Sequence, residues 1–106
     1  MIRLAVARVH PDQVDALRAW FHELESGRRA EALLTLADER CSHELATLVE
    51  SSDGPLLVYA MEVEDEGRSR AAYAASSHAI DSEHRAVMAA ALNGQPTHER
   101  VLDLRP

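Results

Sequence analysis

The run Leu56–Met61 constrains the fold of this chain more than any other segment. Its residues, Leu-Leu-Val-Tyr-Ala-Met, are apolar at both odd and even positions. Successive side chains of a strand point to opposite faces, so a strand with this composition is covered on both sides. We expect helices of the same chain to cover one face. In a chain of 106 residues, the simplest cover for the other face is a second copy of the protein.

The segments before this run predict a strand and a long helical region. Residues 2–9 alternate with apolar side chains at period two, and His10-Pro11-Asp12 ends the pattern, with Asp12 well placed to cap a helix. Residues 14–39 predict one long helix that kinks or breaks at Gly27. Its expected core-facing side chains are Val14, Leu17, Phe21 and Leu24 before the break, and Ala30, Leu33, Leu34 and Ala37 after it.

The remaining segments predict a hairpin, two further helices and a last strand. Polar residues at 76–78 separate the two helices, and Asn93-Gly94-Gln95-Pro96 ends the second one. The expected boundaries are a hairpin at about 41–64 with its turn at 51–55, helices at about 68–76 and 81–92, and a strand at 100–104.

The resulting order, β-α-β-β-α-β, is that of the ferredoxin-like split βαβ arrangement. It predicts an α+β protein in which one domain, residues 1–106, has a four-stranded antiparallel sheet backed by helices on one face. Because the central strand is apolar on both sides, two such sheets are expected to pack face to face in a homodimer. The prediction is a dimeric α/β barrel with a cavity between each sheet and its own helices.

The charge of the chain excludes several classes of partner and of chemistry. With 11 basic and 18 acidic side chains, the formal net charge of −7 disfavours binding to nucleic acid or to an anionic membrane. Every basic residue is Arg, which excludes Schiff-base chemistry and a P-loop lysine. The single Cys41 fits a reducing compartment. With no signal-peptide pattern and no long apolar run, we expect a cytoplasmic protein.

His84 is the residue most in need of an explanation. On a helical wheel it lies about 40° from Ile80, inside the apolar stripe that also contains Val87. A histidine that faces a sheet from this position needs partners for its ring nitrogens. It is either a core histidine satisfied by a neighbour or a general acid/base that faces the predicted cavity.

Several other side chains are candidates for the same site. Asp81 lies one turn before His84, where it could orient the imidazole, or it could simply be the N-cap of the helix. His78 sits in the break between the helices, where it could reach the cavity mouth or be an exposed loop residue. Side chains that could contact a ligand, but that are more often plain core, are Tyr59 and Met61 on one face of the central strand, Tyr73 and Trp20.

No metal site is predicted. Cys41 and His43 lie two residues apart on one strand and point the same way, but no third ligand is within reach in the sequence. Ser42-His43-Glu44 cannot assemble a catalytic triad, because adjacent strand residues alternate faces. The remaining histidines, which have no patterned neighbours and are expected at the surface, are His10, His22 and His98.

The second helical region carries the signature Ser-x-His-x-Ile-Asp-x-Glu-His-Arg, formed by Ser76, His78, Ile80, Asp81, Glu83, His84 and Arg85. Through it, nearly the whole chain resembles an uncharacterised bacterial family of the dimeric α/β-barrel superfamily. More distantly, the chain is similar to antibiotic-biosynthesis and heme-degrading monooxygenases of that superfamily. In the heme enzymes a histidine near the position of His84 ligates iron, so the resemblance implies heme as a candidate cofactor. The chain lacks their first-strand Asn, and Val63-Glu64-Asp65 stands where they carry aromatic residues before the helix.

Three functions remain open at this point. The first is a small enzyme without a cofactor, of the oxygenase, isomerase or cyclase type, that acts on an organic metabolite. In it His84 would be the general acid/base, Asp81 would orient it, and His78 or Tyr59 would be a second polar contact. The second is heme binding through His84. The third is a non-catalytic module that binds a ligand or a partner.

Overall fold

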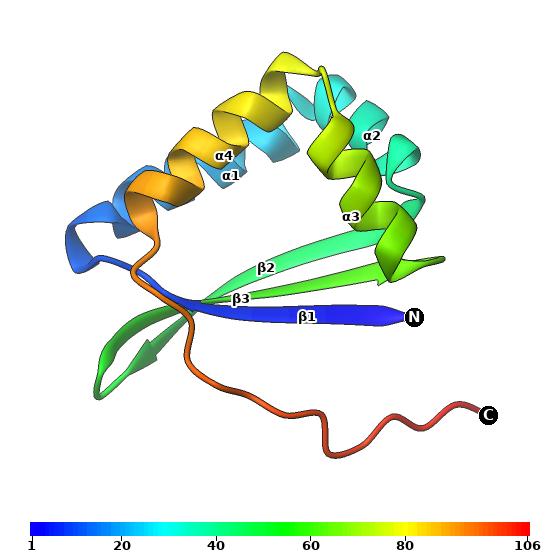
Figure 1. Cartoon of the computed structure of the whole chain (residues 1–106). Coiled ribbons are helices and arrows are strands. Elements are labelled where there is room, and N and C mark those ends of the chain that lie inside the picture. The colour runs from blue at the N-terminus through cyan, green and yellow to red at the C-terminus, as the bar shows by residue number, and fades with distance from the viewer.

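The computed structural model describes residues 1–106 as a three-stranded antiparallel sheet with helices on one side of it (Figure 1). The strands are β1 (Ile2–Arg8), β2 (Cys41–Ser51) and β3 (Gly54–Val63), in the order β1-β3-β2. A single turn of 3-10 helix, η1 (Pro11–Gln13), precedes the four helices α1 (Val14–Glu25), α2 (Arg29–Asp38), α3 (Glu66–Ala75) and α4 (Ala79–Ala91). None of these helices combines the length and the apolar character needed to cross a membrane.

β3 is the central strand, as its apolar run predicted, and it pairs with both β1 and β2. Alternate side chains of the three strands point to opposite faces of the sheet. The inner face, toward the helices, carries Arg3, Ala5 and Ala7 of β1, Leu57, Tyr59 and Met61 of β3, and Glu44, Ala46 and Leu48 of β2. The outer face carries Ile2, Leu4 and Val6 of β1, Leu45 and Val49 of β2, and the even-numbered residues of β3.

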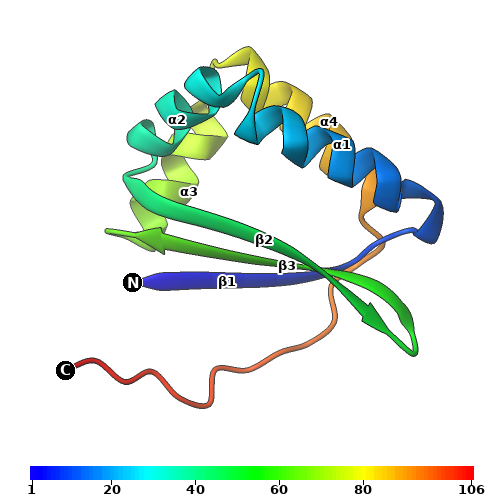
Figure 2. The same cartoon turned by 180° about the vertical axis from the view of Figure 1, so that it is seen from behind.

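The helices lie over the inner face in two pairs, α1 with α4 and α2 with α3 (Figures 1 and 2). The break expected at Gly27 is confirmed, because α1 ends at Glu25 and α2 begins at Arg29. A second break at residues 76–78 separates α3 from α4. Asp65 caps α3 by accepting a hydrogen bond from the backbone N–H of Arg68 at 2.8 Å. The cap expected at Asp12 is wrong, since this residue lies inside η1.

The predicted core-facing side of α2 is wrong. Its apolar set, Ala30, Leu33, Leu34 and Ala37, is exposed to solvent. The break at Gly27 interrupts the helix, so the apolar stripe of α1 does not continue in phase into α2. The side chains that α2 turns toward the sheet are Ala32, Thr35 and Leu36, and they border a cavity rather than a packed core.

The predicted fourth strand is also wrong. The backbone of the chain after α4 bonds to that of β1 only at its start, where Arg8 N–H donates to Gly94 O at 2.8 Å and Asn93 N–H donates to Arg8 O at 2.7 Å. Gly94 then adopts a positive φ of 80°, and Pro96 has no N–H with which to continue a ladder. Farther along, the Arg100 side chain donates to Ile2 O at 2.8 Å. The tail leaves the edge of β1 and runs on the side of the sheet away from the helices (Figures 1 and 2).

Without this strand, the four-stranded ferredoxin-like sheet and the dimeric α/β barrel built on it are wrong, although the structure is compatible with the α+β class. The packed core lies at one end of the inner face, where Val9, Leu17, Leu57 and Ala91 form a buried cluster. The rest of the inner face is not filled by side chains from the helices. That space contains the candidate site.

Candidate functional site

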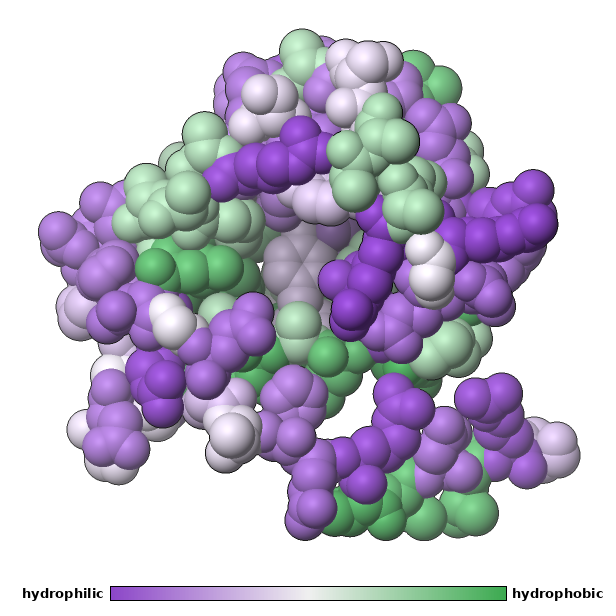
Figure 3. All heavy atoms as spheres, in the orientation of Figure 1, coloured by the Kyte–Doolittle hydropathy of each residue, from purple (hydrophilic) through white to green (hydrophobic).

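A cavity of about 430 Å³ lies between the inner face of the sheet and the helices. Figure 3 shows the molecule hollowed between its helices and its sheet. The cavity exists in part because Ala5 and Ala7 of β1 and Ala32 of α2, which border it, are too short to fill the space. Of its 20 lining residues 12 are hydrophobic, so the cavity suits an organic molecule with an apolar body.

His84 faces this cavity from α4, surrounded by aromatic rings. The ring centroids of Trp20 and Tyr59 lie 6.2 Å from that of His84, and those of Phe21 and Tyr73 lie 6.4 Å from it. The chain contains one Trp, one Phe and two Tyr, so all of its aromatic side chains gather around this one histidine. The expectation that His84 lies on the sheet-facing side of its helix is confirmed.

One hydrogen bond decides which ring nitrogen of His84 carries the proton. The indole Nε1–H of Trp20 donates to Nδ1 of His84 at 2.9 Å. An indole nitrogen only donates, so Nδ1 must offer its lone pair and the neutral ring carries its hydrogen on Nε2. Burial lowers the pKa of His84, and Arg85 lowers it further against the opposing effect of Asp81. The residue is therefore a neutral imidazole that presents an Nε2–H donor.

Asp81 does not orient His84 through a hydrogen bond. Its side chain is buried and accepts a hydrogen bond from Ser76 Oγ at 2.5 Å. Ser76 Oγ in turn accepts from the backbone N–H of His78 at 3.2 Å, so this group holds the break between α3 and α4 in shape. Nor is Asp81 the N-cap of α4, because that position belongs to His78.

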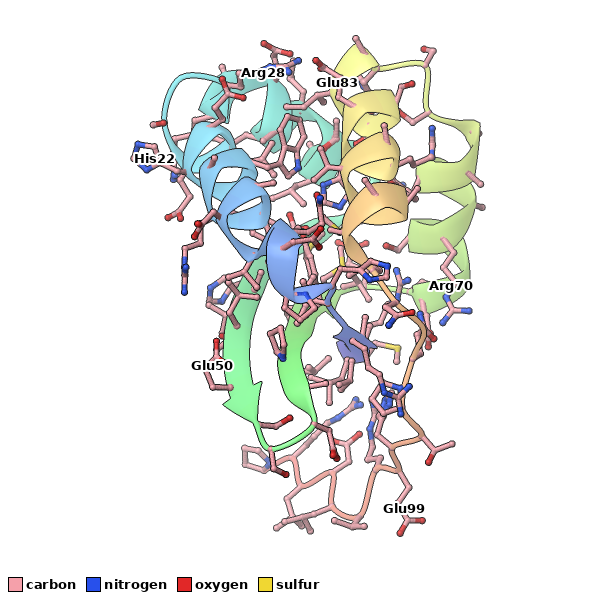
Figure 4. All side chains as sticks on the ribbon, turned by 90° about the vertical axis from the view of Figure 1, so that its left-hand side faces the viewer. His22, Arg28, Glu50, Arg70, Glu83 and Glu99 are labelled. Atoms are coloured by element: carbon pink, nitrogen blue, oxygen red, sulfur yellow. The ribbon has the colours of Figure 1, made fainter.

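The other polar residues of the signature also bind neighbouring elements. His78 Nε2 lies 2.7 Å from Asp38 Oδ2, and the residue does not border the cavity. Glu83 forms an ion pair at 2.5 Å with Arg28, as the two labelled side chains show in Figure 4. Arg85 donates to Tyr73 O and lies over the Tyr73 ring, 4.6 Å from its centroid. We call the six polar signature residues the helix seam: Ser76, His78, Asp81, Glu83, His84 and Arg85.

Sequence reasoning missed Glu39, which follows α2 and borders the cavity. Its side chain is only 6% exposed, and no protein group donates a hydrogen bond to its carboxyl. Burial, together with the nearby Glu44 and Asp81, raises the pKa of Glu39 to about 7 against the opposing effect of Arg3. Nothing in the helical pattern distinguishes this residue, because it stands at the very end of the periodic segment.

Glu44 is a second missed carboxyl on the cavity wall. Burial raises its pKa, while a hydrogen bond with the Tyr59 hydroxyl opposes the shift. Burial and the neighbouring Glu44 raise the pKa of Tyr59 in turn. A signal for Glu44 was present in the sequence, because it shares its face of β2 with Ala46 and Leu48 and is therefore a charged residue on the buried side.

The remaining candidate residues divide clearly. Tyr59, Met61 and Tyr73 border the cavity, whereas Trp20 does not and acts on His84 instead. Cys41 is buried with its thiol against His43 O, and a register shift separates these two residues on β2. The structure contains no group of three or more His, Cys, Asp or Glu side chains arranged to hold a metal ion. Among the histidines expected at the surface, His22 and His98 are exposed and His10 is half-buried.

The surroundings of His84 do not fit an axial heme ligand. Ligation through Nε2 needs a lone pair on that atom and a hydrogen on Nδ1 that donates to a neighbouring acceptor. Here Nδ1 already accepts from Trp20. A change of tautomer would place two N–H groups against each other and leave the buried indole without an acceptor, which costs about 1–3 kcal/mol.

Comparison with known proteins adds a family but no function. Residues 1–106 match the model of a family described as a family of unknown function (DUF6176). No curated protein and no solved structure matches the chain. The resemblance to the dimeric α/β-barrel superfamily stays a prediction.

Proposed function

The chain belongs to the DUF6176 family of unknown function. Because the family supplies no function, we propose from the geometry of the cavity that the protein is an enzyme. Its substrate would be a small organic molecule bound in the cavity, and the reaction a proton transfer without a cofactor, as in an isomerase. The observation that carries this proposal is Glu39, a buried residue on the cavity wall to whose carboxyl no protein group donates a hydrogen bond. Buried carboxyls normally have such partners, so one without them is a candidate functional group.

Glu39 has the properties of a general acid/base. With a pKa of about 7, it is divided between its two protonation states near neutral pH, which is where a group that both accepts and returns a proton works best. The carboxyl approaches the cavity from the end of α2, beside the wall formed by Arg3 and Glu44. Glu39 thus takes the role that the sequence pattern suggested for His84.

His84 has a different role in this proposal. Its Nε2–H is a neutral donor that can hydrogen-bond to the bound molecule but cannot take a proton from it while Trp20 occupies Nδ1. Neutral histidines act in this way when a buried site keeps them uncharged. Tyr59, Met61 and Tyr73 then form walls that position the molecule.

The decisive test is the exchange of carbon-bound hydrogen for deuterium in D₂O, followed by NMR over a panel of ketones, nitriles and iminium salts. The unaltered protein should accelerate exchange for at least one class. Glu39→Gln should lose about a hundredfold or more of this rate, the usual range for a general acid/base. Glu50→Gln is the matched control, because Glu50 is exposed on β2 and points away from the body of the protein (Figure 4).

Two outcomes would overturn the proposal. If Glu39→Gln exchanged hydrogen at the full rate, Glu39 would not be the general acid/base. Binding of panel members without any accelerated exchange would favour the non-catalytic module instead. Hemin titration gives a separate reading of the heme alternative, for which the unaltered protein should develop no His84-dependent Soret band.

We also propose that the protein associates with a second copy through the outer face of its sheet. On this face Ile2 of β1 is 58% and Leu45 of β2 is 54% exposed, and exposed apolar side chains that share one face of a sheet mark an interaction surface. The C-terminal tail runs on the same side and exposes further apolar residues, with Val101 at 82% and Leu104 at 81% (Figures 1 and 2). An identical partner supplies matching apolar surface to cover both.

Sedimentation velocity at micromolar concentration tests the association. The unaltered protein should sediment as a dimer, and Leu45→Lys should return it to a monomer, because a charge placed in the interface cannot be desolvated cheaply. Leu33→Lys is the matched control on α2, a half-exposed leucine on the opposite side of the molecule. A monomer in the unaltered protein would exclude the dimer.

A further inference from the structure

We infer that Trp20 determines the substrate class of the cavity: by holding the hydrogen of His84 on Nε2, it makes the site select an uncharged carbonyl compound with a hydrocarbon body. The carbonyl oxygen would accept the Nε2–H of His84. This inference rests on the proposed function, in which Glu39 exchanges a proton with the bound molecule. In it, Trp20 is a positioning residue and does not touch the substrate.

The first step of the argument is that the tautomer of His84 has no alternative. Trp20 comes from α1 and is 8% exposed, so water cannot readily replace His84 Nδ1 as the acceptor of its indole N–H. The surrounding rings also restrict the imidazole, with Tyr59 edge-on at 86° and Tyr73 at 83° to it. Moving the proton to Nδ1 would leave a buried donor unpaired, which disfavours that tautomer about tenfold or more.

The second step is that an oxygen acceptor satisfies Nε2–H. This nitrogen has no hydrogen-bond partner within the chain, although His84 borders the cavity. A carbonyl oxygen accepts such a hydrogen bond through its lone pairs, whereas a hydrocarbon group of the same shape leaves the donor unsatisfied. A site built to hydrogen-bond an oxygen of its substrate rejects the analogue that lacks this acceptor.

The third step concerns charge. Three carboxyl side chains, Glu39, Glu44 and Asp81, border the cavity, and so does Arg85, whose hydrogen bond to the neutral carbonyl of Tyr73 leaves its charge unpaired. Arg3 borders it without a salt bridge, but it lies close enough to Glu39 to act on that carboxyl. Charges of both signs therefore border the cavity, so neither an anion nor a cation meets a wall of uniformly opposite charge, and the Nε2–H donor of His84 cannot pair with a cation. An uncharged molecule with a hydrogen-bond acceptor fits both constraints.

The resulting step balances without an external oxidant or reductant. The Glu39 carboxylate takes a proton from the carbon next to the carbonyl, and the electron pair of that C–H bond becomes the C=C bond of an enolate. The C=O π electrons move to the oxygen, where the Nε2–H of His84 stabilises the developing charge. The Glu39 carboxylic acid then returns its proton to the same carbon or to a conjugated one.

The experiment compares two matched probes, cyclohexanone and methylenecyclohexane, which differ in C=O against C=CH₂. Binding to the unaltered protein, followed by NMR shifts of the cavity methionines Met61 and Met88, should favour the ketone about tenfold. Trp20→Phe should reduce this preference severalfold and leave methylenecyclohexane binding unchanged. Phe21→Leu is the matched control, because it removes a ring 6.4 Å from His84 without removing a donor.

Two measurements on the unaltered protein keep the inference testable if Trp20→Phe fails to fold. Long-range ¹H–¹⁵N NMR of His84 should show hydrogen on Nε2 and none on Nδ1, and the infrared stretch of bound ¹³C=O cyclohexanone should fall relative to the ketone in hydrocarbon. Equal binding of the two probes, an unshifted carbonyl stretch or hydrogen on Nδ1 would each overturn the inference.

The inference and the proposed function can fail separately. If deuterium exchange depends on Glu39 but the ketone preference is absent, the assignment of Trp20 and of the substrate class is wrong and the proton-transfer function stands. If the ketone binds with the expected preference but Glu39→Gln exchanges at the full rate, the substrate class stands and the proposed function is wrong.

Discussion

The helix seam and the cavity wall lie side by side, and each contains a buried carboxyl. The two carboxyls differ in whether the chain supplies a hydrogen-bond partner. In the seam, the buried carboxyl of Asp81 accepts a hydrogen bond from Ser76 Oγ at 2.5 Å. On the wall, Glu39 is equally buried and has none. The comparison teaches that two equally buried carboxyls can differ in whether the chain supplies a hydrogen-bond partner, so burial alone does not identify a functional group.

The largest expected effect concerns the pH dependence of stability at Glu39. Its pKa is about 7 in the folded protein against an ordinary value of 4.5, so the folded state binds this proton more strongly. Stability should therefore fall as the pH rises from about 4.5 to about 7, by up to about 3 kcal/mol, and then level off. Glu39→Gln should remove most of this slope and stabilise the protein at pH 8. Urea unfolding at pH 5 and pH 8 measures both, and a destabilised Glu39→Gln at pH 8 would show that the carboxyl has a partner after all.

The opposite sign is expected for Asp81 in the seam. Asp81→Ala removes the acceptor of the Ser76 hydroxyl and leaves that donor unsatisfied, so the free energy of unfolding should fall by about 2 kcal/mol. The measurement is urea unfolding at pH 7. Ser76→Ala provides the double-mutant cycle: if the two changes add instead of overlapping, the Ser76–Asp81 contact is not what stabilises the break between α3 and α4.

A smaller loss is expected for Trp20→Phe, of about 1 kcal/mol beyond the change in packing, because one hydrogen bond to His84 is removed while most of the ring is retained. The pKa of His84, lowered by burial, should stay below its ordinary value in this variant, because the ring remains enclosed by Phe21, Tyr59 and Tyr73. NMR titration of the ring protons measures it. A return of the pKa to the ordinary value would mean that Trp20, and not the cavity, excludes water from His84.

The smallest effect is expected at the exposed end of the seam. Glu83→Gln breaks the ion pair with Arg28, but Glu83 is half exposed and Arg28 keeps Glu31 as a partner at 2.8 Å. Ion pairs that are exposed to water contribute little to stability and are screened by salt. The midpoint of thermal unfolding should therefore fall less in Glu83→Gln than in Asp81→Ala. At high salt, the midpoints of Glu83→Gln and of the unaltered protein should become equal. A loss as large as that of Asp81→Ala would mean that the whole seam acts as one unit.

Local patterns predicted the elements far better than they predicted the contacts between them. Gly27 and the polar residues at 76–78 placed the two breaks between consecutive helices, and apolar alternation placed the strands of the hairpin, because such signals act within one or two turns of chain. The strand expected at 100–104 failed for a different reason. A short apolar alternation is compatible with pairing, but Gly94 and Pro96 direct the chain away from β1 before it can pair.

The candidate site shows the same limit. His84 was found because a polar residue on an apolar helical stripe is visible in one segment. The tautomer of His84 could not be found in this way, because it depends on Trp20, which lies 64 residues away in the sequence. Glu44 could have been found from the alternation of β2, where it shares a side with Ala46 and Leu48. Glu39 could not, because its burial depends on how the end of α2 meets the sheet.

The sequence by itself determined the central apolar strand, the helices with their breaks and the inward side of α4, since each follows from periodicity and backbone preference over a few residues. Only the tertiary structure decided that the small side chains of β1 would leave a cavity, that the polar signature would bind neighbouring helices, and that Glu39 would be buried without a partner. The physical reason is that a hydrogen bond needs two groups in space, and most polar partners here come from different elements of the chain.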